Sequence, residues 1–243
     1  MTGPAPGVVV TCEHGGNHIP ALYRALFGDL QAALASHRGF DPGALEMAED
    51  LARAFGAPLV SSTVSRLLVD LNRSVGHPRL HAGPVRSLGE GQKAEILARF
   101  YRPYRGRAEQ AIRTAIAEHG AVLHLSSHSF TPELDGKRRT ADIGLLYDPR
   151  RPGEAALCER WKAALGARLP ALNIRRNYPY AGKGDGLTAW LRQRLSPESY
   201  VGVELEVNQQ HILGTGSHWP ALREAIVTAL RDALAGDPPA ASR

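Results

Sequence analysis

The sequence predicts a single α/β domain with a mixed, mostly parallel sheet that is flanked by helices. Short apolar runs rich in β-branched residues alternate with longer segments whose apolar residues recur at helical spacing. The 243 residues can bury one large core, and no internal repeat or long linker divides them. We therefore expect residues 1–243 to form one domain.

The first third of the chain carries predicted strands around one predicted helix. The run GVVVTC at 7–12 is apolar and bounded by glycine and proline, as buried strands are. Residues 43–55 space their apolar side chains as a helix does, and a Gly-Ala-Pro sequence ends it. A second strand is expected at 59–63. The apolar run at 66–73 ends in polar residues like a further strand, and 74–92, rich in Gly, Pro, His and Ser, predicts a loop.

The middle of the chain continues this alternation. A long helix is predicted over 91–118, with a kink or division at Pro103, because proline removes a backbone N–H and clashes with the preceding turn. The apolar runs 121–125 and 143–147 predict two strands. The Ala/Leu face of 153–169 predicts a helix after the second of them.

The last part of the chain begins with a polar, aromatic loop at 175–186. A short helix is predicted at 187–195, a final strand at 200–207 and a C-terminal helix at 219–235. Strands and helices thus alternate along the whole chain, which is the pattern of an α/β sheet.

The composition excludes several classes of protein. There are 29 Lys and Arg against 24 Asp and Glu, with no tract of five or six like charges and 6% aromatics, so no nucleic-acid partner is expected. Cys12 and Cys158 are too few for a disulfide framework. No run of about 18 apolar residues occurs, so no membrane partner is expected, and the N-terminus lacks the basic segment of a signal peptide. We expect a soluble, cytoplasmic protein whose oligomeric state stays open.

Polar residues stand at four predicted strand ends. Open α/β sheets keep their sites at the carboxyl ends of strands. A hydrolytic zinc site needs about three N or O ligands, an open position for water and a carboxylate as general base. The chain can supply this set from the following segments: Glu13 and His14, Asp70 to Arg73, Ser127 to Ser129, and Glu204 with Glu206, which share one face of their strand.

Six segments between residues 12 and 209 resemble the N-formylglutamate amidohydrolase family, in the expected order. They are CEHGGNHIP, SHRGFDPGA, VDLNRS, SSHSFTP, NYPYAGKGDGLT and VELEVNQ. That family is similar to aspartoacylase, succinylglutamate desuccinylase and the zinc carboxypeptidases. The resemblance therefore implies a zinc carboxypeptidase-like fold and a cofactor, Zn²⁺ or another divalent metal.

The resemblance implies a metal held by His14, Asp41 and His128. In the carboxypeptidase-like relatives a ligating Glu follows the first histidine by three residues, but Asn17 stands there in this chain. Asp41 is the nearest replacement, and Glu13 is the second choice because strand alternation turns it away from His14. Asp41 also precedes Pro-Gly-Ala at a helix start, so a helix N-cap is its alternative role.

The resemblance also implies the catalytic residues. Glu206 is expected to be the general base, because the Glu-Val-Asn-Gln segment matches the family's last motif, and Glu204 is then a supporting partner or part of an ion pair. Arg66 is expected to polarise the scissile carbonyl, as an arginine at similar spacing does in the relatives. Its alternative role is a solvated residue at the start of a strand.

The substrate-binding residues follow in the same way. Asn72 and Arg73 are expected to hold a substrate carboxylate, with an Arg73 to Asp70 ion pair as the structural alternative. Tyr180 and Thr188 belong to a loop that is expected to form a rim or lid over the substrate, or else an ordinary surface turn.

These residues together predict a zinc-dependent amidohydrolase that removes an N-acyl group, most simply N-formyl, from an acidic amino acid. Hydrolysis of another small amide and a non-catalytic metal or carboxylate binder are the alternatives. A serine hydrolase is not expected, because the chain has no Gly-x-Ser-x-Gly sequence around Ser127 or Ser129. Cys12, inside a predicted strand, is expected to be a small buried residue and not a nucleophile.

Overall fold

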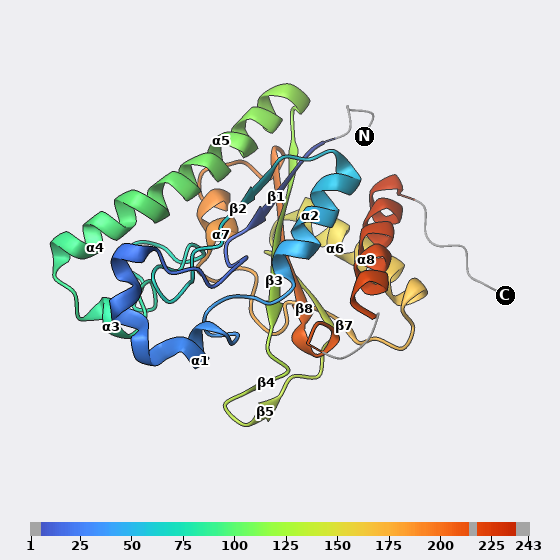
Figure 1. Ribbon diagram of the computed structural model, residues 1–243. Helices are drawn as coiled ribbons and strands as arrows, with labels where there is room; N and C mark the ends of the chain where they lie inside the picture. Colours follow the sequence, from blue (N-terminus) through green and yellow to red (C-terminus); the bar gives the residue numbers. More distant parts are fainter. Residues whose placement is uncertain (1–5, 214–217, 237–243) are drawn as a thin grey trace.

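A computed structural model describes residues 6–213 and 218–236. Its centre is a six-stranded sheet in the order β2-β1-β3-β8-β6-β7 (Figure 1). Only the β6 and β8 pair is antiparallel, so the expected mixed, mostly parallel sheet is confirmed. The strands are β1 (Gly7–Cys12), β2 (Leu59–Ser61), β3 (Val122–Phe130), β6 (Ile143–Leu146), β7 (Ile174–Arg176) and β8 (Tyr200–Asn208).

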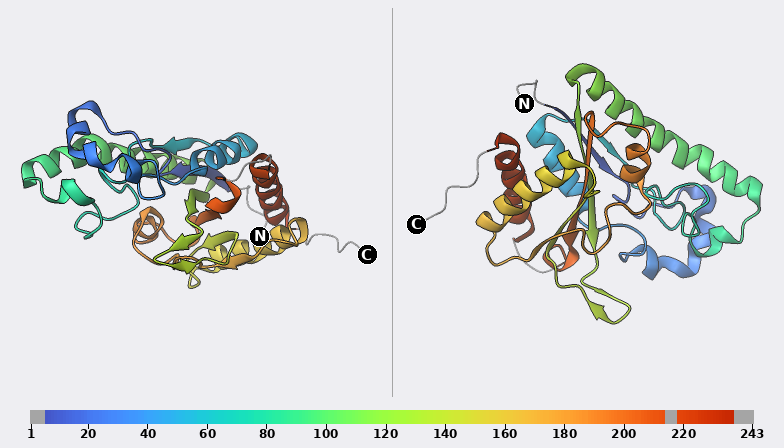
Figure 2. Two further views of the ribbon diagram at one scale, coloured as in Figure 1. Left: turned by 60° about the horizontal axis from the view of Figure 1, so that its bottom comes forward. Right: turned by 180° about the vertical axis from the view of Figure 1, so that it is seen from behind.

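Helices cover both faces of this sheet (Figure 2). One face packs against α2 (Ala44–Phe55), α6 (Pro152–Arg168) and α8 (His218–Ala235). The other packs against α5 (Arg102–His119) and α7 (Leu187–Arg192). The short elements are a 3-10 segment (Ala21–Leu30), α1 (Gln31–Leu34), α3 (Gly83–Arg86), α4 (Glu90–Ile96), a π-helical turn (Leu97–Tyr101), a second 3-10 turn (Gln209–His211) and the hairpin β4 (Glu133–Leu134) and β5 (Lys137–Arg138).

The two central strands, β3 and β8, run parallel with His128 opposite Glu206. Their side chains alternate between the two covered faces. Leu125 and Leu205 enter the core under α2, α6 and α8, whereas His128 and Glu206 face the side covered by α5 and α7. The register of this one strand pair therefore decides which side chains meet at the candidate site.

One expected strand is absent from the described structure. The run at 66–73 is largely buried but forms turns. Ser65 starts them, because its Oγ accepts a hydrogen bond from the Leu67 backbone N–H and donates to the Gly39 carbonyl. The expectation of a strand there was wrong, because side-chain bonds to the backbone replace the ladder.

The other differences concern lengths and short elements. The predicted strand 121–125 extends as β3 to Phe130, so His128 lies inside a strand and not after it. The expected loop 74–92 contains α3 and the start of α4, and the expected loop 175–186 begins inside β7. The predicted helix 91–118 is divided, as expected near Pro103, by the π-helical turn that ends just before α5.

Candidate active site

Two histidines from neighbouring strands face the same carboxylate oxygen. His14 follows β1, and His128 lies on β3, which pairs with β1. The Nδ1 atom of His14 lies 3.2 Å from Asp41 Oδ2, and the Nδ1 atom of His128 lies 2.9 Å from that same oxygen. All three residues are buried. The structure therefore brings together the three residues expected to hold a metal.

The second nitrogen of each imidazole meets a carboxylate of its own. His14 Nε2 lies 2.7 Å from Asp70 Oδ1, and His128 Nε2 lies 3.0 Å from Glu13 Oε2. Without a metal, burial lowers the pKa of His128, but Asp41 and Glu13 outweigh it and raise the pKa above its usual range, so both of its nitrogens carry protons. A metal at Nδ1 would displace the proton there, and the carboxylate at Nε2 would hold the other, as is usual for histidines that bind metals.

The three donor atoms fit a metal ion. They lie within 4.8 Å of one another, which one cation at the centre can span. Two imidazole nitrogens and one carboxylate oxygen are a donor set that zinc accepts, with a fourth position left for water or substrate. Glu13, the second choice for a ligand, contacts the far side of the His128 ring and lies outside this donor group.

Glu13 supports the site from the Nε2 side of the His128 ring. It is fully buried and accepts hydrogen bonds from Tyr104 Oη (2.8 Å) and Ser126 Oγ (2.6 Å). Burial raises the pKa of this carboxyl, but the hydrogen bonds from His128 and Ser126 and the charge of His128 outweigh it, so the net pKa lies below its usual range. Glu13 is therefore an anion that orients His128.

Asp41 is placed by the turn before α2. Its backbone N–H donates to the His14 carbonyl (2.9 Å), and helix α2 has Gly43 at its N-cap with no side-chain cap. The N-cap role for Asp41 was therefore wrong. Ser127 and Ser129, on the opposite face of β3 from His128, donate to the carbonyls of Ala44 and Pro42 and tether this turn to the strand.

Arg66 bridges the two aspartates. Its Nη1 donates to Asp41 Oδ1 (3.1 Å) and its Nη2 donates to Asp70 Oδ2 (2.8 Å). Burial raises the pKa of Asp70, but Arg66 and His14 outweigh it and keep Asp70 ionised. The Arg66 side chain is 26% exposed, and these two bonds use two of the five guanidinium N–H donors. Arg66 thus orders the candidate ligands and retains donors for a substrate.

Glu206 is the unsatisfied carboxylate of the site. It lies opposite His128 in the sheet, is 5% exposed, and its Oε2 has no hydrogen-bond partner among the described residues. Burial raises the pKa of this carboxyl to about 8; His128 opposes the rise, and the Asp41 and Glu204 charges add to it. A buried carboxyl with a free oxygen beside the ligands has the properties of a general base.

Glu204 differs from Glu206 although both side chains share one face. Its Oε1 accepts a hydrogen bond from Thr188 Oγ1, so this carboxylate is partnered. Thr188 is completely buried, and it faces Glu204 from the start of α7. The structure thus places Thr188 behind the site, as the support of a neighbouring carboxylate.

The side chains of Asn72 and Arg73 contact different neighbours, and only Asn72 approaches a candidate metal ligand. Asn72 Nδ2 is 3.4 Å from His128 Nε2, and Asn72 Oδ1 accepts the Leu187 N–H (2.7 Å). Arg73 donates to the Asp185 carbonyl (2.9 Å), whereas Asp70 is bound by Arg66 and His14. The Arg73 to Asp70 ion pair does not form.

The loop that carries Tyr180 packs against β6 next to Glu206. Gly144, the antiparallel partner of Glu206, lies under this loop, and a Cβ at that position would come within 2.0 Å of the Tyr178 carbonyl. Only glycine permits this close approach. Tyr180 is 47% exposed and accepts a hydrogen bond from Arg139 Nη2 (3.1 Å). The loop therefore forms part of the rim around the site.

Sequence reasoning missed the partners that orient the histidines. Asp70, Glu13 and Ser126 stand in or beside the quoted motifs, but nothing in their spacing shows that they meet the imidazoles. Tyr104 and Arg139 lie outside all motifs and carry no sequence signal.

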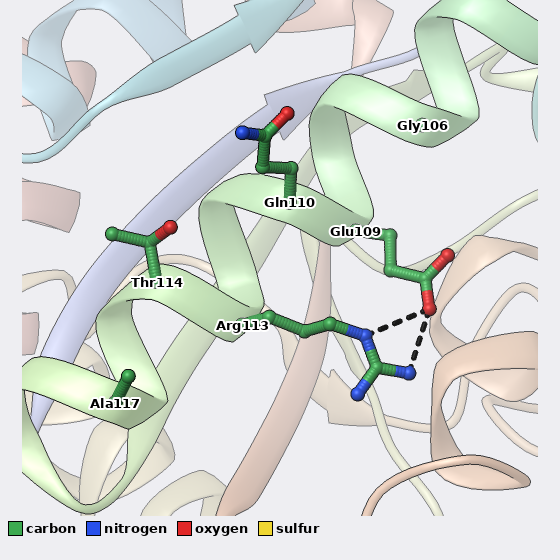
Figure 3. Close-up of a pocket in the computed structure, with 6 residues that line it drawn as sticks. All are labelled: Gly106, Glu109, Gln110, Arg113, Thr114 and Ala117. Atoms are coloured by element: carbon green, nitrogen blue, oxygen red, sulfur yellow. Dashed lines mark hydrogen bonds and ion pairs between the residues drawn. The ribbon is translucent and has the colours of Figure 1, made fainter.

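The described residues also form a hollow on the outer side of α5, away from this site (Figure 3). All its lining residues come from that one helix, and Arg113 there donates to Glu109 (2.7 Å). The charged residues of this hollow are already paired with each other, and no set of functional groups converges there. The candidate active site is therefore the cluster of His14, Asp41 and His128 with Glu206. None of the described helices is both long and apolar enough to cross a membrane.

The fold and this cluster define an α/β protein with a candidate three-ligand metal centre and an adjacent buried carboxylate. Residues 7–213 match the sequence model of the N-formylglutamate amidohydrolase family, and the chain belongs to this family. It is a hydrolase that acts on amide bonds. A comparison with curated protein sequences gives no match.

Two solved structures resemble the whole fold. A gene product of Agrobacterium tumefaciens is 29% identical, with a TM-score of 0.82 over 96% of this chain and 92% of the other. The N-formylglutamate amidohydrolase from Ralstonia eutropha JMP134 is 21% identical, with a TM-score of 0.69 over 96% of this chain and 94% of the other. At that identity the second structure supports the fold alone.

Proposed function

We propose that this protein is a zinc-dependent amidohydrolase that removes the formyl group from an N-formyl acidic amino acid, with N-formylglutamate as the first candidate. The family match and the name of the Ralstonia relative support this substrate. The observation that carries the mechanism is the convergence of His14 Nδ1 and His128 Nδ1 on Asp41 Oδ2, next to the free oxygen of Glu206.

His14, Asp41 and His128 would hold the metal. The chemistry that a divalent cation supplies at this position is Lewis acidity, which polarises the amide carbonyl and lowers the pKa of water. Asp70 and Glu13 keep both imidazoles in the tautomer that presents Nδ1, and Arg66 holds Asp41 and Asp70 in place.

Glu206 moves the proton. Its Oε2 takes a proton from the attacking water and delivers it to the amine as the C–N bond breaks. Arg66 donates a remaining N–H to the formyl oxygen while that oxygen gains negative charge. Asn72 and Arg73 bind the α-carboxylate, and Tyr180 contacts the substrate from the rim, while Thr188 holds Glu204 behind the site.

Formate release from N-formyl-L-glutamate by the zinc-loaded protein tests this proposal. Glu206→Gln should reduce kcat by about 10²–10⁴-fold and leave one zinc bound, because general acid–base catalysis contributes that much. Glu204→Gln is the matched control on the same strand face, and it should lose far less activity. Full activity in Glu206→Gln, or no formate from the wild type, would contradict the proposal.

A further inference from the structure

Arg139 lies beside Tyr180, in the loop near Glu206, and has one unpaired guanidinium nitrogen. It follows β5, where the hairpin returns to the sheet, and its backbone N–H donates to the Pro132 carbonyl (2.8 Å). Its Nη2 donates to Tyr180, whereas its Nη1 is buried without a hydrogen-bond partner. Within residues 6–213 and 218–236 no carboxylate forms an ion pair with Arg139.

The guanidinium is held in one orientation by two aromatic rings. Its Cζ lies 5.8 Å from the centroid of the Phe130 ring and 5.0 Å from that of the Tyr180 ring. Rings at these distances stabilise the cation but accept no conventional hydrogen bond from Nη1. A buried N–H of a charged group without an acceptor raises the free energy of the folded protein, so an anionic acceptor would be favoured at this position.

Arg139 packs on Phe130, which lies farther along β3 than His128. Phe130 lies two residues after His128 on the same face of β3, which is about 7 Å farther along the strand. In N-formylglutamate the side-chain carboxylate is four bonds from the amide nitrogen, a separation of roughly 5 Å. An amide placed at His128 and Glu206 thus brings that carboxylate toward Arg139.

The surrounding charges also favour an anion here. The pKa of His37, in the segment that leads to Asp41, is lowered by burial and then by the charges of Arg139, Arg38 and Arg66. These three cations therefore lie near His37, where Asp41 is the anion that acts on it in the opposite direction. A positive field of this kind attracts an acidic substrate more than a neutral one.

We propose that Arg139, oriented by Phe130 and Tyr180, binds the side-chain carboxylate of the substrate and selects acidic over neutral N-formyl amino acids. This inference rests on the proposed function and deepens it. The planar guanidinium can present Nη1 and Nη2 side by side to the two carboxylate oxygens. Asn72 and Arg73 then serve the α-carboxylate, so each of the two substrate carboxylates has its own arginine.

The test is the ratio of kcat/KM for N-formyl-L-glutamate over that for N-formyl-L-glutamine, a neutral substrate of nearly the same shape. Arg139→Met should lower this ratio by about 10- to 100-fold, because a charge-assisted hydrogen bond is lost for one substrate only. Arg139→Lys should restore part of it. Equal losses for both substrates would show a purely structural role and overturn the proposal, as would an unchanged ratio.

Arg138→Met is the matched control, because Arg138 is the exposed neighbour on the same hairpin and should not change the ratio. Calorimetric titration with glutarate separates this inference from the proposed function, since it needs no turnover. Wild type should bind glutarate at least 10-fold more tightly than Arg139→Met. Equal affinities, or no binding to wild type, would overturn the role of Arg139 even if formate is released, whereas binding without formate release would refute only the hydrolysis.

Discussion

The two faces of the β3 and β8 pair are both buried, yet they differ in chemistry. One face packs apolar side chains against α2, α6 and α8, and the other carries histidine, serine and glutamate under α5 and α7. The apolar set is Leu123, Leu125, Val203, Leu205 and Val207, and the polar set is His124, Ser126, His128, Glu204 and Glu206.

This difference separates stability from function. The apolar face stabilises the sheet by burial alone, whereas each polar group must find a partner to be tolerated in the interior. His124 does so with Thr11 and Tyr200, and Ser126 with Glu13. Glu206 retains an unpartnered oxygen, and that exception marks the reactive position.

The largest expected effect comes from the polar face. His128→Ala should abolish stoichiometric zinc binding and reduce kcat/KM by more than about 10³-fold, beyond the 10- to 100-fold typical of losing a supporting residue. Zinc content by atomic emission and formate release measure both quantities, with circular dichroism as the control for folding. A folded variant that keeps one zinc and its activity would break the division between the two faces.

Sequence reasoning predicted the frame of this site but not its internal contacts. The apolar run 7–12 predicted β1, because burial on both faces of a strand leaves a continuous apolar pattern, and the run 200–207 predicted β8. The polar segment from Ser126 to Ser129 gave no such signal, because its strand conformation depends on pairing with β8, a tertiary contact.

The same limit applies to Arg66 and Asp70. Both were noticed, but their roles depend on turns at 66–73 where a strand was expected. In a strand, residues four apart share a face but stand about 13 Å apart, whereas the turns bring Arg66 Nη2 within 2.8 Å of Asp70 Oδ2. The ligand triad itself was predicted from motif order, which survives such local differences.

The apolar face should show the opposite effect to His128. Leu125 is completely buried in the core under α2, so Leu125→Ala should lower the free energy of unfolding by about 2–5 kcal/mol through lost burial and the cavity left behind. Urea unfolding measures this loss. The folded fraction should still bind one zinc, and a loss of zinc binding without a loss of stability would reverse the assignment of the two faces.

The Glu206 carboxyl should lower the stability of the metal-free protein as pH rises. Its pKa rises from 4.5 to about 8 on folding, so the unfolded chain releases this proton at lower pH than the folded protein does. The carboxyl therefore destabilises the fold increasingly as pH rises from 4.5 to 8. Glu206→Gln should be more stable than wild type above pH 8, by on the order of 1–3 kcal/mol.

Unfolding of both proteins in the presence of a chelator, at several pH values, checks this prediction. The stability difference should grow with pH through that window and level off above it. A variant that is less stable than wild type at pH 8.5 would mean that Glu206 is a satisfied structural carboxylate.

The smallest effect should come from Ser127, one of two serines on the mostly apolar face. Its Oγ donates to the Ala44 carbonyl (2.8 Å) at the start of α2, so Ser127→Ala should cost about 1 kcal/mol of unfolding free energy. Denaturant titration against wild type measures it. A large loss of activity with unchanged stability would instead assign Ser127 a direct chemical role.

The central claim is that His14, Asp41 and His128 form one metal centre at the ends of the sheet strands. Anomalous diffraction at the zinc edge from crystals grown with zinc tests it most directly. We predict one strong peak about 2.0–2.2 Å from His14 Nδ1, His128 Nδ1 and Asp41 Oδ2, near the free oxygen of Glu206. A fully occupied zinc bound elsewhere, with no peak between these three atoms, would contradict the account.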